Sequence, residues 1–76
     1  MKLIDFQKML TPHTVVMLCA WPKYPAMGLW FGYIEACDFG IFGSNNVVFL
    51  ELMDKGLFPV LCIYLELRGW FGPPNL

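Results

Sequence analysis

Residues 57–67 read LFPVLCIYLEL, and this stretch decides the fold. One face of a strand here would carry Leu61, Ile63, Leu65 and Leu67, and the other face Cys62, Tyr64, Glu66 and Arg68. Because the side chains of a strand point alternately to its two faces, this alternation predicts a β-strand. Pro59 has no backbone N–H to donate, so we expect the strand to bend there or to lie at an edge.

Three further elements are predicted before this strand. Apolar side chains at helical spacing over residues 3–10 predict one short amphipathic helix, which the dipeptide Thr11-Pro12 ends. Residues 14–21 are apolar at nearly every position and predict a strand buried on both sides. A loop over residues 22–28, marked by two prolines and a glycine, leads to a second strand over residues 29–37.

The segment before the last strand has two interpretations. Residues 38–46 are rich in glycine and asparagine and predict a loop. Residues 47–53 then form either a strand, joined to the last strand by the hairpin connector Asp-Lys-Gly at 54–56, or a short helix that begins at Ser44 or Asn46. The hairpin is the preferred interpretation, because valine and phenylalanine favour strands.

The order of these elements predicts one α+β domain over residues 1–76. A short N-terminal helix is followed by four strands. We expect the strands to form an antiparallel, strongly curved sheet or a small SH3-like barrel, with the helix over one opening.

The composition indicates a protein that works by contact. Hydrophobic residues make up 58% of the chain and charged residues 14%, whereas a domain of about this size buries only about 60% of the surface of its unfolded chain. The remaining apolar surface predicts a partner, either another copy of the chain or another molecule. The net charge is −1, with no cluster of lysine or arginine, so neither nucleic acid nor a membrane surface is an expected partner.

Location and cysteine chemistry follow from local patterns. Asp5, Gln7 and Lys8 interrupt any apolar core of a secretory signal, and no apolar run reaches the length of a membrane span. The three cysteines have long spacings and lie within apolar runs. They therefore predict buried thiols in a reducing cytoplasm.

No group of residues predicts a reaction. His13 is the single histidine, at a turn between the helix and the first strand, where a surface role is preferred over that of a general base. Ser44 is the single serine and lacks the pattern of a nucleophile elbow. We therefore expect no enzyme, no cofactor and no metal site.

The aromatic residues are the best candidates for a binding surface. Tryptophan and tyrosine each need a partner for their polar atom, and both are enriched at interfaces. Two cations accompany them in the sequence. The predicted binding residues are Trp21, Tyr24, Trp30, Tyr33, Trp70, Phe71, Lys23 and Arg68.

Three segments carry a resemblance to a known group of proteins. They are residues 6–10 leading into Val15 and Val16, the stretch from Ala20 to Phe31, and residues 58–63 with Trp70 before the proline-containing tail. Their order resembles small phage-encoded proteins that counter bacterial immune systems, in particular the anti-Thoeris nucleotide sponges. The resemblance implies an N-terminal helix with a small SH3-like sheet, and a phage or prophage accessory protein in the host cytoplasm.

Two functions are preferred at the level of sequence, ahead of an interfacial membrane protein or a subunit of a larger complex, with an enzyme last. The first is a non-enzymatic binding protein that self-associates and inhibits a host defence protein, or another host protein, by direct contact. The alternative is an oligomeric sponge for a small molecule such as a nucleotide signal. Its pockets would lie between subunits and be lined by Trp21, Tyr24, Trp30 and either Lys23 or Arg68.

Overall fold

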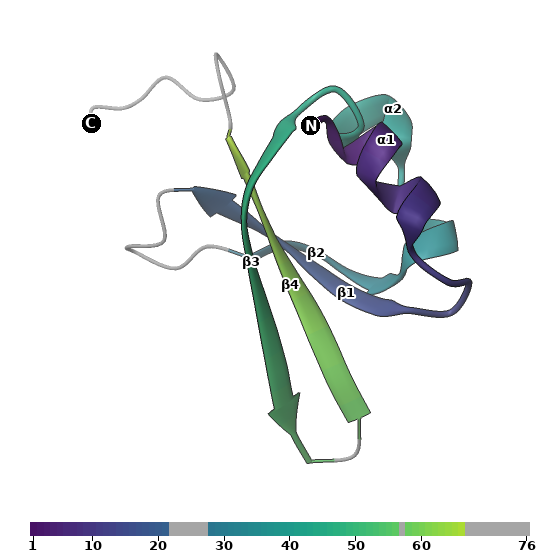
Figure 1. Cartoon of the computed structure of the whole chain (residues 1–76), viewed down its shortest axis with the longest axis vertical. Coiled ribbons are helices and arrows are strands. Elements are labelled where there is room, and N and C mark those ends of the chain that lie inside the picture. The colour runs from purple at the N-terminus through teal and green to yellow at the C-terminus, as the bar shows by residue number, and fades with distance from the viewer. Residues whose placement is uncertain (22–27, 57, 67–76) are drawn as a thin grey trace.

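The computed structural model describes residues 1–21, 28–56 and 58–66. Within these ranges the chain forms two short α-helices, two 3-10 turns and four strands (Figure 1). In chain order they are α1 (Leu3–Phe6), η1 (Gln7–Met9), β1 (Val15–Trp21), β2 (Gly28–Tyr33), η2 (Ile34–Ala36), α2 (Phe39–Phe42), β3 (Asn46–Lys55) and β4 (Phe58–Glu66).

The four strands form one open, mixed sheet in the order β2-β1-β4-β3. Strands β1 and β2 pair antiparallel, as do β3 and β4, whereas the two central strands β1 and β4 run parallel. The α+β class and the short N-terminal helix are confirmed. The prediction of a strictly antiparallel, strongly curved sheet or closed barrel is wrong.

The side chains of the strands explain why the sheet is not a meander, in which strands consecutive in the chain would be neighbours throughout. Strands β1 and β4 carry apolar side chains on both faces, so they gain most from central positions. Strand β2 contains Gly28 and Gly32, and β3 carries Glu51 and Asp54, and such residues suit edge strands. Together η2 and α2 carry the chain from one edge of the sheet to the other, which brings β4 parallel to β1.

Helices α1 and α2 lie together on one side of the sheet (Figure 1). The backbone N–H of Ile4 donates to the carbonyl of Gly43 at 3.0 Å, and the N–H of Leu3 donates to the carbonyl of Asn45 at 2.9 Å. These bonds hold the N-terminal segment against the crossover. The main core lies between the helices and the sheet and consists of Leu3, Val16, Leu18, Ile34, Cys37, Phe42, Ile63 and Leu65.

Two boundaries in the middle of the chain differ from the predictions. The second strand ends at Tyr33, and residues 34–36 form a 3-10 turn instead of its last part. The predicted loop over residues 38–46 contains helix α2, because the Asp38 carboxylate accepts hydrogen bonds from the N–H groups of Gly40 and Ile41 at 3.0 and 3.3 Å. Such a side-chain cap satisfies backbone donors that the helix itself leaves unpaired.

The hairpin interpretation of residues 47–53 is confirmed. Strand β3 pairs with β4 from Asn46↔Glu66 to Lys55↔Phe58. Strand β1 begins its pairing with β4 only at Leu61, so Pro59 lies where β4 has β3 alone as its neighbour. A proline is tolerated at such a position, since its missing N–H breaks no bond to a second strand.

Two predictions fall largely outside the described residues. They are the loop over residues 22–28, of which only Gly28 is described, and the docking of a tail that carries Trp70 and Phe71. None of the helices within the described ranges is long and apolar enough to span a lipid bilayer.

Candidate functional site: the open face of the sheet

The face of the sheet opposite α1 and α2 is covered by no helix or strand of the described chain (Figure 1). We call it the open face. Cross-strand partners point to the same side of a sheet, so the strand register assigns its members. They are Val15, Met17, Cys19 and Trp21 on β1, Phe31 and Tyr33 on β2, Phe49, Glu51 and Met53 on β3, and Phe58, Val60, Cys62, Tyr64 and Glu66 on β4.

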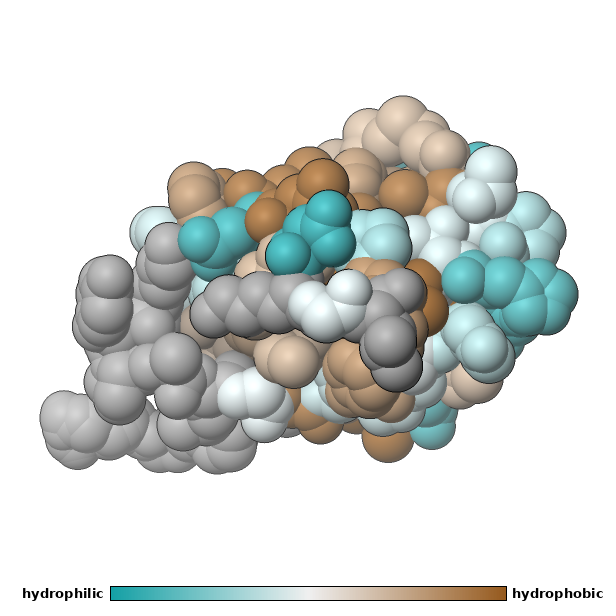
Figure 2. Space-filling view, turned by 90° about the horizontal axis from the view of Figure 1, so that it is seen from below, coloured by the Kyte–Doolittle hydropathy of each residue, from teal (hydrophilic) through white to brown (hydrophobic). Residues whose placement is uncertain are grey.

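Large aromatic side chains of the open face reach the solvent. Phe31 is 54% exposed and Tyr33 is 51% exposed. Trp21, Phe49 and Phe58 are also exposed, although to a smaller extent. Hydrophobic residues also reach the surface at the β3–β4 hairpin end of the molecule, where hydrophilic residues lie between them (Figure 2). Large apolar side chains that gather on one surface mark interaction sites more often than single exposed residues do.

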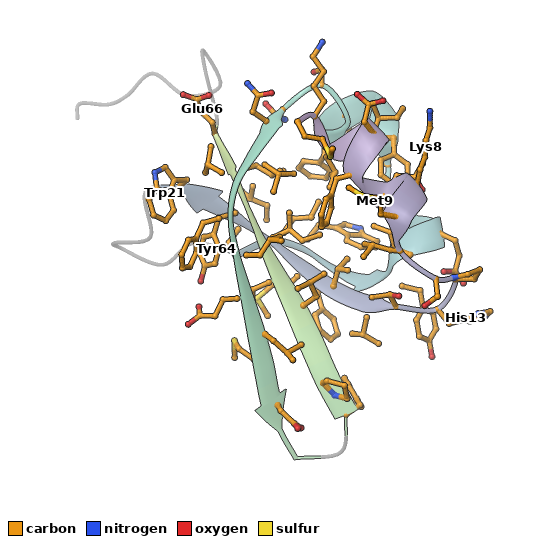
Figure 3. The ribbon with its side chains drawn as sticks, in the orientation of Figure 1. Lys8, Met9, His13, Trp21, Tyr64 and Glu66 are labelled. Carbon is orange, nitrogen blue, oxygen red and sulfur yellow. The ribbon has the colours of Figure 1, made fainter. Side chains whose placement is uncertain are left out.

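Three aromatic rings form a cluster at one end of the open face. The ring centroids of Trp21 and Phe49 lie 5.4 Å apart, those of Phe49 and Tyr64 5.5 Å, and those of Trp21 and Tyr64 6.0 Å. Trp21 and Tyr64 lie on the side of the sheet away from α1 (Figure 3). The two edge-to-face contacts that Tyr64 makes have the geometry that aromatic quadrupoles prefer. The cluster therefore packs the partly exposed indole of Trp21 against two neighbouring rings.

The hydroxyl of Tyr64 connects this cluster to a carboxylate. It donates a hydrogen bond to Oε1 of Glu51 at 3.1 Å. Burial of the ring, followed by this hydrogen bond, raises the pKa of Tyr64 to about 12. Tyr64 is therefore a neutral donor at physiological pH.

A shallow hollow opens at the other end of the open face. It has a volume of about 360 Å³ and lies between Val15, Phe31, Gly32, Tyr33 and Phe58. Its volume falls within the range of small-molecule pockets, about 300–1,000 Å³. None of the described residues that line it is charged, so its chemistry suits an apolar or aromatic group.

The structure separates the predicted binding residues. Trp21 and Tyr33 lie on the open face, at its two ends. Trp30 points to the helix side and packs against the main core, where its ring lies over Gly32, so close that a Cβ there would be 3.0 Å from Cη2. Trp21 and Trp30 therefore do not share a surface within one chain. The other predicted binding residues, Lys23, Tyr24, Arg68, Trp70 and Phe71, lie outside the described residues.

Several residues of the open face were absent from the predicted binding set. Phe31 and Phe49 fit a core assignment by sequence alone, and Phe58 lies next to a proline. One signal could have found Phe31, because it lies two residues before Tyr33 and shares its face in a strand. Phe49 and Phe58 depend on the pairing of β3 with β4, which the residues themselves do not show.

His13 lies in an exposed turn. Its backbone N–H donates to Oε1 of Glu35 at 2.7 Å, and its Nε2 lies 3.3 Å from Oε2 of the same carboxylate. The backbone hydrogen bond lowers the pKa of Glu35. His13 also contacts the ring of Tyr33 edge-on, at 5.4 Å between centroids. These contacts pack the turn before β1 against Tyr33 and Glu35, at the start of η2.

The three cysteines are buried, as the sequence predicted. Burial, with a smaller contribution from Asp38, raises the pKa of Cys37 to about 11. Burial also raises the pKa of Cys19, and the neighbouring Cys62 adds to that effect. Among the described residues, no three side chains of histidine, cysteine, aspartate or glutamate gather into a group that could hold a metal.

Comparison with known proteins gives no evidence on the function. No protein-family model, no curated protein and no solved structure matches the chain.

Proposed function

We propose that this chain is a non-enzymatic binding protein that acts by contact, with the open face as its binding surface. The observation that carries the proposal is the asymmetry of the sheet. Two helices cover one face, whereas the other presents partly exposed rings on all four strands. Aromatic side chains dominate the energetics of protein interfaces, because each buries a large area at a small cost in entropy.

The first partner we propose is a second copy of the chain. If the open faces of two copies meet, each copy contributes the same rings to the interface, as in a symmetric homodimer. The aromatic cluster of Trp21, Phe49 and Tyr64 supplies preorganised rings for such a contact. Preorganised side chains lose little further freedom on binding, and this favours affinity.

The second partner we propose is a host protein that the chain inhibits by occupying its surface. The support for this role is the sequence resemblance to phage-encoded anti-defence proteins, together with the apolar open face. In this role the protein would act in the cytoplasm of a bacterial host.

Light scattering after size-exclusion chromatography tests self-association, and a tagged chain used as bait in bacterial lysate tests the host partner. We expect the molar mass to rise with concentration from monomer to dimer. We also expect a specific host protein to be retained by the wild-type chain and lost by a variant with a charge on the open face. A chain that stays monomeric at every concentration and retains no host protein would contradict the proposal.

A second candidate function is the capture of a small molecule. The supporting observation is the uncharged hollow beside Phe31, Tyr33 and Phe58, which favours an aromatic or apolar ligand over a phosphate. Mass spectrometry of the supernatant after heat denaturation would identify a ligand that co-purifies with the protein. If no ligand is released, and no compound of a nucleotide panel shifts the melting temperature, this candidate fails.

A further inference from the structure

Four sulfur-containing side chains gather in the middle of the open face. Strand β1 supplies Met17 and Cys19, β4 supplies Cys62, and β3 supplies Met53. Cys19 and Cys62 are buried in a small second core against which both methionines pack. We call these four residues the sulfur cluster. It lies outside the hollow described above.

Contacts within the sulfur cluster centre on Cys62. Its thiol donates to Sδ of Met53, at 3.2 Å between the sulfur atoms. The thiol of Cys19 donates to the carbonyl of Met17 at 3.9 Å, and Cys19 and Cys62 belong to the same small buried core. Met17 is the register partner of Cys62 on the adjacent strand. Three sulfur atoms, from Cys19, Cys62 and Met53, are thus brought together by three different strands.

This set of donors has a defined chemical preference. Thiolate sulfur is a soft ligand that binds Cu(I), zinc and iron–sulfur clusters, and the still softer thioether of a methionine favours Cu(I) among these. No imidazole belongs to the sulfur cluster, since the ring of His13, the single histidine, contacts Tyr33 and Glu35. We propose that Cys19, Cys62 and Met53 form a binding site for one Cu(I) ion.

The distance between the Cys62 and Met53 sulfurs is compatible with a three-coordinate ion after a small movement. With metal–sulfur bonds of about 2.3 Å, as for zinc thiolates, two sulfurs of a trigonal site lie roughly 4 Å apart. The 3.2 Å contact between Cys62 and Met53 therefore has to lengthen by somewhat less than about 1 Å. Met53 can provide this movement, because its unbranched side chain has three rotatable bonds and adapts to irregular spaces.

The proton balance makes binding depend on pH. Cu(I) replaces the protons of the Cys19 and Cys62 thiols, so two protons leave, two metal–sulfur bonds form and no electron is transferred. The thiolate pair and the ion together carry one negative charge. Binding should therefore tighten as the pH rises.

Anaerobic titration with Cu(I), in competition with a chromophoric Cu(I) chelator, tests the site. We expect wild type to bind one ion per chain and Cys19→Ser and Cys62→Ser to lose it. Met53→Leu conserves volume and so keeps the fold, and we expect it to weaken binding by at least about tenfold. Cys37→Ala is the matched control, because Cys37 is a buried thiol in the other core, and it should bind as wild type does.

Three outcomes would overturn the proposal. They are the absence of Cu(I) binding by the wild-type chain, equal binding by wild type and Met53→Leu, and a loss of binding in Cys37→Ala as large as in Cys19→Ser. Circular dichroism of each variant shows whether it is folded. If Cys19→Ser or Cys62→Ser does not fold, the comparison of Met53→Leu with wild type decides whether the site exists.

Discussion

Replacement of one exposed ring by a charge should separate the protein's association from its folding. Phe31 lies on the open face and Ile41 lies on α2, on the other side of the sheet. Both side chains are 54% exposed. The variants Phe31→Lys and Ile41→Lys therefore change the same exposed fraction of an apolar residue, but only the first changes the open face.

The expected effect follows from the exposed area of the ring. A phenylalanine side chain buries about 200 Å² when it is fully covered, and 54% of this is about 110 Å². At ~25 cal/mol per Å², covering that area in an interface contributes about 2.7 kcal/mol. The loss of one such ring weakens a dimer about 100-fold in Kd. Since a symmetric dimer loses two rings and must also bury or displace two charges, this value is a lower bound.

Sedimentation velocity over a range of concentrations measures this effect. We expect Ile41→Lys to self-associate as wild type does, and Phe31→Lys to remain monomeric at concentrations where wild type is dimeric. Thermal melts should show that both variants stay folded, because neither side chain belongs to a buried core. If Phe31→Lys associates as tightly as wild type, or if Ile41→Lys weakens association equally, the open face is not the surface of contact.

Further predictions concern stability. In urea denaturation, Leu18→Ala should cost about 2–5 kcal/mol because Leu18 is fully buried, whereas Leu52→Ala, at a site that is 67% exposed, should cost far less. Tyr64→Phe removes a hydrogen bond to a carboxylate and should lower the free energy of unfolding by about 1.5 kcal/mol. For the control Tyr33→Phe, on the exposed edge strand, we expect a change within about 0.5 kcal/mol. Equal costs of the two substitutions would contradict the role of the Tyr64 hydroxyl. In the folded state the pKa of Tyr64 is raised from 10 to about 12, and the pKa of Cys37 from 9 to about 11. Each group therefore makes a constant contribution to the free energy of unfolding below its ordinary pKa, and this contribution is lost as the pH rises through its folded pKa. A free energy of unfolding that is the same at pH 8 and at pH 11.5 would contradict both shifts.

The strands could be predicted because their signal is local. Alternation along residues 57–67 and the apolar run over residues 14–21 both mark strands without reference to the rest of the chain. The parallel pairing of β1 with β4 could not be predicted in this way, since it depends on contacts between segments far apart in the sequence. Helix α2 was missed because Gly40 and Gly43 indicate a loop, whereas the Asp38 side chain caps the helix.

The candidate site could be predicted only in part, because it too depends on how segments far apart in the sequence pair in the sheet. Trp21 and Tyr33 lie on the open face, but Trp30 belongs to the opposite face, because neighbouring positions of a strand point to opposite sides. The sulfur cluster has no motif in the sequence. Cys19 and Cys62 are distant along the chain and meet only through the pairing of the two central strands.

The most direct test of the open face is hydroxyl-radical footprinting of the wild-type chain, at concentrations well below and well above its self-association constant. The measured quantity is the rate of oxidation of each aromatic side chain. We expect Phe31, Tyr33 and Phe58 to be protected at high concentration, and Phe39 on α2 to react at the same rate in both states. Protection of the helix side with unchanged oxidation of Phe31 and Tyr33 would contradict the account.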